Sequence, residues 1–98
     1  MARLYGVSLS SPAVVLTFPI VIDTKLSTMG DWIRLNQFQW FLFSDRTKTE
    51  VAEQVSASIA TGDHVVVTVI APEFAQGNAP QWIWDWLNEK MSKQIMGP

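Results

Sequence analysis

The chain contains no cysteine and a single histidine, His64, among its 98 residues. Without cysteine it can form neither a disulfide framework nor a thiolate metal site, and one histidine does not supply the ligand set of a zinc site. Seven basic residues against nine acidic ones give a formal net charge of −2, which argues against a strongly basic nucleic-acid-binding protein. A hydrophobic content of 48% over this length instead predicts one globular domain with a core of its own.

Long hydrophobic runs are also missing. The longest candidate, AVVLTFPIVI at residues 13–22, is interrupted by Pro19 and falls well short of the about 20 residues that a membrane-spanning helix needs. Arg3 is the only charge before Asp23, and no small-residue cleavage site follows, so a signal peptide is not indicated. We therefore expect a cytoplasmic protein that forms one domain over residues 1–98, with a C-terminal extension from about residue 79.

The N-terminal third predicts a strand and a helix. Residues 2–9, ARLYGVSL, alternate and are rich in β-forming residues, which is typical of a strand that residues 10–12 interrupt. Residues 13–17 fit either a short extra strand or an irregular loop. Pro19 suits the first turn of a helix, and Gly30 suits its end, so we expect a helix from about Phe18 to Met29.

The stretch GDWIRLNQFQWFLFSD, residues 30–45, predicts a β-hairpin. Asn36 and Gln37 form the tight connection between strands over 31–35 and 38–43. Thr47 and Glu50 then make a capping box for a second helix, with Val51, Val55 and Ile59 on one side. We expect Gly62 to close that helix.

The remainder predicts a strand and a last helix. Residues 64–70, HVVVTVI, form a β-branched run that suits a buried central strand. Residues 71–79 are expected to form a loop, and Pro80 opens a helix over QWIWDWLNEKMSKQ. The order β-α-β-β-α-β with an added tryptophan-rich helix predicts an α+β fold of the ferredoxin-like sandwich type.

This architecture leaves an apolar sheet face to be covered. Both helices of such a fold lie on one face, yet the second hairpin strand is apolar on both sides. The C-terminal segment or a second copy of the chain would have to cover the other face, because soluble monomers rarely expose large apolar patches. We predict a homodimer whose interface contains Phe38, Trp40, Leu42, Trp82, Trp84 and Trp86.

The segments GDWIRLNQFQWFLFS, the capped helix, GDHVVVTVI and WIWDWL together resemble the SinR-family small proteins. These are similar in fold to the smaller CRISPR-adaptation protein and to the VapD-type ribonucleases. The resemblance implies a ferredoxin-like fold and a homodimer built through the sheets. In nuclease members, an acidic residue at the end of the first strand helps to hold a divalent metal. Ser8 stands at that position here, and serine is a poor primary ligand for Mg²⁺.

Few other residues point to chemistry. We interpret His64 as a strand-start residue beside Asp63, and Asp31, Asp45 and Asp63 as turn or strand-end residues that make local hydrogen bonds. A phosphate-binding glycine loop, a G-x-S-x-G elbow and an S-x-x-K pair are all missing, and we expect no cofactor.

The sequence is therefore compatible with two functions. The first is a non-catalytic, self-associating ferredoxin-like protein. The alternative is a metal-dependent endoribonuclease or other nuclease of the CRISPR-adaptation or VapD type, which has the same fold and would use Asp31 or Asp45 in place of the first-strand acid. Nucleic acid is a candidate partner through three basic residues near the hairpin and the second helix, which could contact phosphates: Arg34, Arg46 and Lys48.

Overall fold

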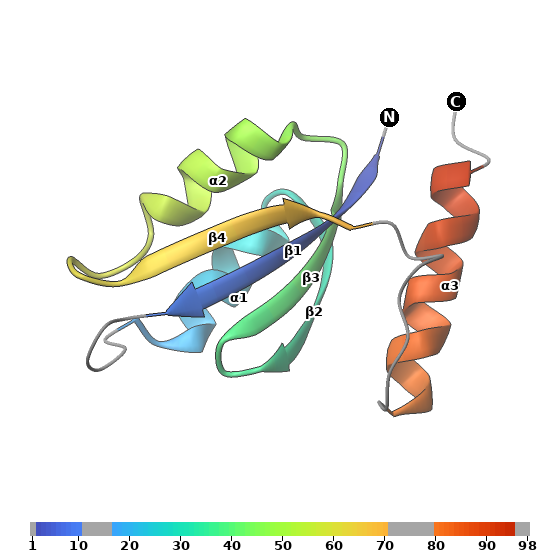
Figure 1. Ribbon diagram of the computed structural model, residues 1–98, viewed down its shortest axis with the longest axis horizontal. Helices are drawn as coiled ribbons and strands as arrows, with labels where there is room; N and C mark the ends of the chain where they lie inside the picture. The colour runs from blue at the N-terminus through green and yellow to red at the C-terminus, as the bar shows by residue number, and fades with distance from the viewer. Residues whose placement is uncertain (1, 11–16, 71–79, 96–98) are drawn as a thin grey trace.

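The computed structural model describes residues 2–10, 17–70 and 80–95 (Figure 1). Its elements run in the order β1 (Arg3–Ser10), α1 (Pro19–Ser27), β2 (Gly30–Asn36), β3 (Gln39–Ser44), α2 (Lys48–Ser56), β4 (His64–Val69) and α3 (Gln81–Ile95). The predicted βαββαβ order with an added C-terminal helix is confirmed. The open question about residues 13–17 and the predicted loop over 71–79 concern segments that lie almost entirely outside the described residues.

The four strands form one antiparallel sheet in the order β2-β3-β1-β4. β1 is central: Tyr5 stands opposite Leu42 of β3 on one side and Val69 of β4 on the other. The two edge strands are therefore β2 and β4. The sequence prediction of a central strand at residues 64–70 was wrong, since β4 lies at the edge of the described sheet.

Helices α1 and α2 cover one face of the sheet and build the main core. Alternate residues of β1 and β3 point into it, as the two-residue period of a strand requires. The buried members of this core are Tyr5, Val7, Leu9, Ile22, Leu26, Met29, Trp40, Leu42, Val51 and Val55. We call this the helix-side face.

Helix α1 is shorter than the predicted Phe18–Met29. Pro19 occupies its first turn, with Phe18 as the N-terminal cap residue, and the helix ends at Ser27. Gly30 does not end the helix; it starts β2 opposite Ser44. A Cβ atom at this position would collide with the backbone of Phe43, so the glycine permits close approach of two strands.

The predicted hairpin is confirmed, with its turn moved slightly. The Asn36 side chain accepts a hydrogen bond from the Phe38 backbone N–H at 2.8 Å and donates one to the Gln39 side chain. Phe38 consequently lies in the turn and not on β3. The register shifts between Arg34 and Asn36, which places a bulge near the end of β2.

Helix α2 has the predicted cap but ends early. The Thr47 hydroxyl accepts a hydrogen bond from the Glu50 backbone N–H at 3.1 Å. The helix stops at Ser56, six residues before Gly62, which instead adopts a φ of 95° in the turn before β4. Beyond the helix, Ala60 donates its backbone N–H to the Thr17 hydroxyl at 2.7 Å.

Helix α3 packs on the opposite face of the sheet, at the end where β1 begins and β4 finishes (Figure 1). Leu4, Ile83 and Leu87 are the buried residues of this second cluster. They are surrounded by half-buried side chains of the sheet and of α3 itself, namely Ile33, Leu35, Phe41, Phe43, Ile70, Trp84 and Trp86. The C-terminal segment of the same chain thus covers part of this face, which we call the α3-side face.

Among the described helices, none has the length and apolar content that crossing a membrane requires.

Candidate functional site

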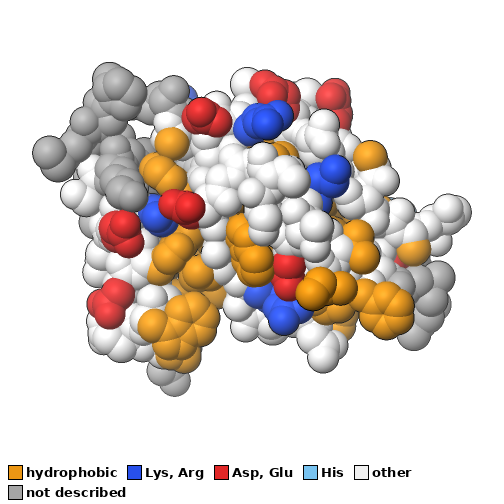
Figure 2. All heavy atoms as spheres, turned by 180° about the vertical axis from the view of Figure 1, so that it is seen from behind, with side chains coloured by type: hydrophobic (Ala, Val, Ile, Leu, Met, Phe, Trp, Pro, Cys, Tyr) orange, Lys and Arg blue, Asp and Glu red, His pale blue; other side chains and the backbone are white. Residues whose placement is uncertain are grey.

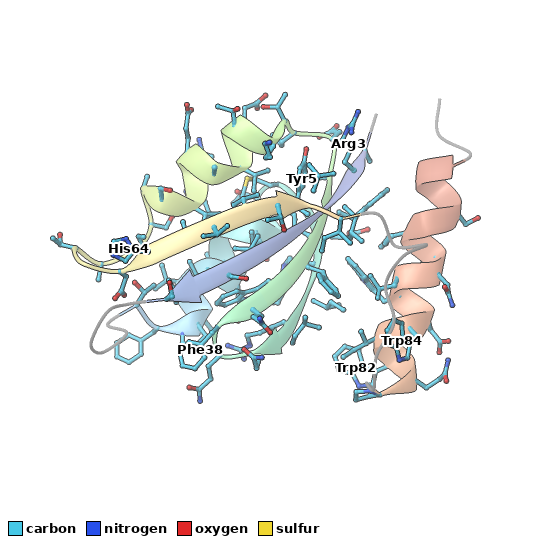
Figure 3. All side chains as sticks on the ribbon, in the orientation of Figure 1. Arg3, Tyr5, Phe38, His64, Trp82 and Trp84 are labelled. Atoms are coloured by element: carbon cyan, nitrogen blue, oxygen red, sulfur yellow. The ribbon has the colours of Figure 1, made fainter. Side chains whose placement is uncertain are left out.

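A cavity of about 400 Å³ lies where the start of β1, the β3–α2 turn and the end of β4 meet. We call it the cationic cavity, because three of the side chains that line it are Arg3, Arg46 and Lys48. The remaining lining residues are Tyr5, Asp45, Thr47 and Val69. Figure 3 shows Arg3 and Tyr5 on the end of β1 that lies beside the start of α2.

Tertiary hydrogen bonds fix the β3–α2 turn that lines this cavity. The Ser44 hydroxyl donates to the Met29 carbonyl at 2.7 Å and accepts from the Arg46 backbone N–H at 3.0 Å. The Tyr5 hydroxyl donates to the Arg46 carbonyl at 2.6 Å. Burial raises the pKa of Tyr5 above its ordinary value, so the hydroxyl keeps the proton that this bond needs at neutral pH. The backbone that carries Arg46 is therefore held in place.

The cations of the cavity are weakly neutralised. Arg46 lies 4.0 Å from the Glu50 carboxylate, and both side chains are exposed, so solvent screens this pair. Within the described part of the chain, no ion pair is found for Arg3 or Lys48. Asp45 is the one carboxylate among the lining residues. The cavity thus carries a positive excess in a chain whose net charge is −2.

The three basic residues singled out in the sequence do not all meet. Arg46 and Lys48 line the same cavity. Arg34 lies on β2, where its guanidinium is 3.4 Å from the buried carboxylate of Asp23. The Trp40 indole N–H donates to the same carboxylate at 2.7 Å. Arg34 therefore serves a structural contact between β2 and α1.

The candidate metal carboxylates are also separated from one another. Asp31 is 2.9 Å from the Lys90 ammonium, and Asp63 accepts from both the backbone N–H and the hydroxyl of Thr17. Asp45 lines the cationic cavity. Within residues 2–10, 17–70 and 80–95, no three side chains of histidine, cysteine, aspartate or glutamate come together as a metal site would require.

Ser8 lies on the α3-side face, beyond the part that α3 covers. It is exposed, stands opposite Gln39 and Val66, and belongs to a hollow of about 250 Å³. The other lining residues are Gly6, Val7, Leu35, Gln39, Trp40, Phe41, Thr68 and Ile70. None of these residues is a carboxylate, so they provide no negatively charged ligand for a metal ion.

The six residues predicted for a dimer interface fall into three environments. Trp40 and Leu42 are fully buried on the helix-side face, so they are not accessible to a partner in this fold. Trp84 and Trp86 are half-buried against the sheet of their own chain. Phe38 and Trp82 are 44% and 54% exposed, and Figure 3 places Trp82 near the start of α3.

Lys90 holds α3 against the sheet. Its side chain is only 5% exposed. Besides Asp31, the ammonium lies 5.6 Å from the centre of the Phe43 ring and 5.4 Å from that of Trp86. An ammonium between two aromatic faces and a carboxylate is a satisfied buried cation, and we assign it a structural role.

The two edges of the sheet differ in their protection. β2 carries Asp31 and Arg34 and ends in a bulge, which are common devices against edge-to-edge pairing. β4 has the sequence HVVVTV and pairs with β1 in unbroken register. It has no lysine, arginine, carboxylate or proline, and Val66 and Val69 are 57% and 47% exposed.

Sequence reasoning missed the contribution of Arg3, Tyr5 and Val69 to the cavity. Arg3 and Tyr5 lie more than forty positions before Lys48 in the chain, and only the β1–β3 register brings Arg3 opposite Ser44. The available signal was the pair Arg46 and Lys48 beside the helix cap.

A scan against protein-family models, a search of the curated proteins and a search of the solved structures each found no match. The resemblance to the SinR family stays a prediction from the sequence.

Proposed function

We propose that this protein is a self-associating module with a ferredoxin-like, SinR-type architecture that acts by binding and not by catalysis. The observation that carries this proposal is the outer edge of β4, which has no neighbouring strand in the described part of the chain. Strand order 2-3-1-4 and two helices on one face support the ferredoxin-like assignment. Since α3 covers the apolar end of the α3-side face, we place the dimer contact at the β4 edge and not between the sheet faces.

Among residues 2–10, 17–70 and 80–95, no backbone hydrogen bond is found to the outer edge of β4. Ile70 donates its N–H to the Leu4 carbonyl at 2.8 Å. The backbone N–H and C=O groups of Ile70, Thr68 and Val66 therefore point toward β1. In an antiparallel sheet the intervening residues point their N–H and C=O groups the other way. The backbone N–H and C=O groups of Val65, Val67 and Val69 therefore point away from the sheet, where another strand could pair with them.

A second copy of the chain fits this edge by symmetry. Two identical strands related by a two-fold axis must run antiparallel, and the same groups are then used on both sides. With the axis beside Val67, Val67 pairs with its own copy and Val65 pairs with Val69 of the other chain. All three outward-facing residues then form ladder hydrogen bonds, and the two four-stranded sheets become one.

The same register accounts for the exposed valines. On the α3-side face, Val66 would stand opposite Thr68 of the second copy, and on the helix-side face Val69 would meet Val65. Cross-strand contacts of β-branched residues stabilise antiparallel pairs. Figure 2, which shows the molecule from behind, has its hydrophobic side chains in separate patches between charged ones. Association through a strand edge relies on main-chain hydrogen bonds and does not require a broad apolar interface.

The alternative of a metal-dependent endoribonuclease has less support. Asp31 and Asp63 make contacts that hold the fold together. Ser8 lies in a hollow whose described lining residues include no carboxylate. A nuclease of this type would use several oxygen ligands in one place.

The proposal is tested by Val66→Lys, with Ile20→Lys as the matched control. Both positions are exposed, 57% and 67% respectively, so neither change should unfold the chain. In the proposed dimer, the lysine introduced on β4 would lie close to its own copy across the axis. We expect the parent to be a dimer by sedimentation velocity at micromolar concentration. Val66→Lys should raise the dissociation constant by about tenfold or more, and Ile20→Lys should leave it unchanged.

A parent chain that stays monomeric at all concentrations would overturn the proposal. So would dissociation by Ile20→Lys together with a stable dimer of Val66→Lys, because that result would move the interface to α1. Circular dichroism of both variants, compared with the parent, establishes that a change in mass reflects assembly and not folding.

A further inference from the structure

We propose that the cationic cavity binds a small phosphorylated molecule, with Arg3, Arg46 and Lys48 as the residues that contact its phosphate oxygens. The cations come from three segments, namely β1, the β3–α2 turn and α2. Only the folded chain brings them together. The cavity shares Val69 with the edge of β4 that the proposed function uses. Its three cations lie on other elements, so they can be removed without changing β4.

The charge of the cavity matches a dianion. Three cations and the Asp45 carboxylate leave an excess of two positive charges among the lining residues. A phosphate monoester carries close to two negative charges at neutral pH. Because Arg3 and Lys48 have no ion pair in the described part of the chain, a ligand would not have to displace a protein carboxylate from them.

The side chains also suit phosphate chemically. Arginine presents a planar fork of N–H donors that can hold two phosphate oxygens at once, and lysine supplies a compact point charge. The backbone at Arg46 is fixed by Tyr5 and Ser44, so less freedom is lost when its side chain is ordered by a ligand. The Thr47 hydroxyl is already used as the helix cap.

The size of the cavity limits the ligand to a small molecule. A volume of about 400 Å³ lies at the lower end of the range for ligand sites. Val69 contributes an apolar wall on one side. We infer a compact phosphorylated metabolite of up to mononucleotide size, and not a nucleic-acid strand, which would need basic residues along an extended path.

A second cavity of the molecule provides an internal contrast. It measures about 440 Å³ and is lined by Ile20, Val21, Thr24, Lys25, Thr28 and Ser58. The two cavities are similar in volume, but this one has a single cation among its lining residues. Removing Lys25 therefore changes the net charge of the protein by the same amount as removing Lys48, away from the proposed site.

The experiment is a titration with inorganic pyrophosphate at constant ionic strength, followed by NMR of the backbone amides. In the parent we expect saturable shifts concentrated at residues 3–5 and 45–48. Arg3→Gln and Lys48→Gln should each weaken binding by about tenfold or more, and Lys25→Gln should change it by less than about twofold. Val66→Lys should bind pyrophosphate as the parent does.

Two results would overturn the proposal. One is a set of shifts that does not saturate and spreads over basic residues throughout the chain, which indicates screening alone. The other is equal weakening by Lys25→Gln and Lys48→Gln, which indicates that only the net charge matters. Amide spectra of the unliganded variants show whether each remains folded, and Arg46→Gln provides a third cavity variant should Arg3→Gln disturb β1.

Discussion

The two faces of the sheet are covered very differently. The helix-side face is sealed by α1 and α2, with ten buried residues in one cluster. The α3-side face is covered at one end by a single helix, and three residues are buried there. Beyond α3 the face ends in Ser8, Gln39, Val66 and Thr68, all of which are exposed.

This difference indicates a gradient of stability within one small chain. Burial of apolar surface is the main favourable term in folding, so the helix-side core should account for most of the free energy of unfolding. The α3 contact is smaller, and elements with few buried contacts open at a lower free energy than the rest. The following substitutions, ordered from the largest expected effect to the smallest, test that comparison.

Leu42→Ala should have the largest effect, because it opens a cavity in the helix-side core. Leu42 is fully buried between β3 and the helices, and truncation of such a residue costs about 2 to 5 kcal/mol. Urea unfolding monitored by circular dichroism measures the loss. If Leu42→Ala loses less free energy of unfolding than Leu87→Ala, the α3-side face contributes more to stability than the helix-side face.

Leu87→Ala should cost about 2 kcal/mol at most, since α3 can separate from the sheet before the rest unfolds. Leu87 is buried in the second cluster with Leu4 and Ile83. Hydrogen exchange should show faster exchange in α3 and retained protection in β1 and β3. Uniformly faster exchange in every strand would show that the two faces unfold as one unit.

Thr47→Ala should cost about 1 kcal/mol, because the Glu50 N–H loses its side-chain acceptor. This change weakens α2 without touching the core it covers, so it separates local helix stability from packing. Thr49→Ala, in the first turn of the same helix, is the control. Equal denaturation midpoints for Thr47→Ala and the parent would mean that the cap contributes little.

Ser8→Asp should have the smallest effect. The residue is exposed on the uncovered part of the α3-side face, so stability should change by no more than about 0.5 kcal/mol. We also expect no Mg²⁺-dependent cleavage of labelled RNA or DNA, because none of the described residues that line that hollow is a carboxylate. Cleavage that a chelator abolishes would show that the remaining ligands of a metal site are present.

Much of the fold could be predicted from local signals. The alternation in β1, Pro19 at the start of α1, Asn36 in the hairpin turn and the Thr47 cap all act on neighbouring residues, and each is confirmed. The prediction that one sheet face needed a cover also follows from strand periodicity, and α3 of the same chain provides part of that cover.

The errors have tertiary causes. The sequence predicts that Gly30 ends a helix, but its role depends on the Phe43 backbone that β3 brings close. Helix α2 ends before Gly62, with the Ala60 N–H bonded to Thr17 from another part of the chain. Arg3 joins Arg46 and Lys48 only through the β1–β3 register. Contacts of this kind leave no pattern within a short window of sequence.

The central position of β1 has a consequence for synthesis on the ribosome. β1 precedes both of its partners, and β4, which completes the sheet, follows it by most of the described chain. At a translation rate of about 5 to 20 residues per second, several seconds pass between the synthesis of β1 and that of β4. Until then the edge of β1 that later receives β4 stays open to other chains. The sheet can therefore be completed only after the HVVVTV strand has been synthesised.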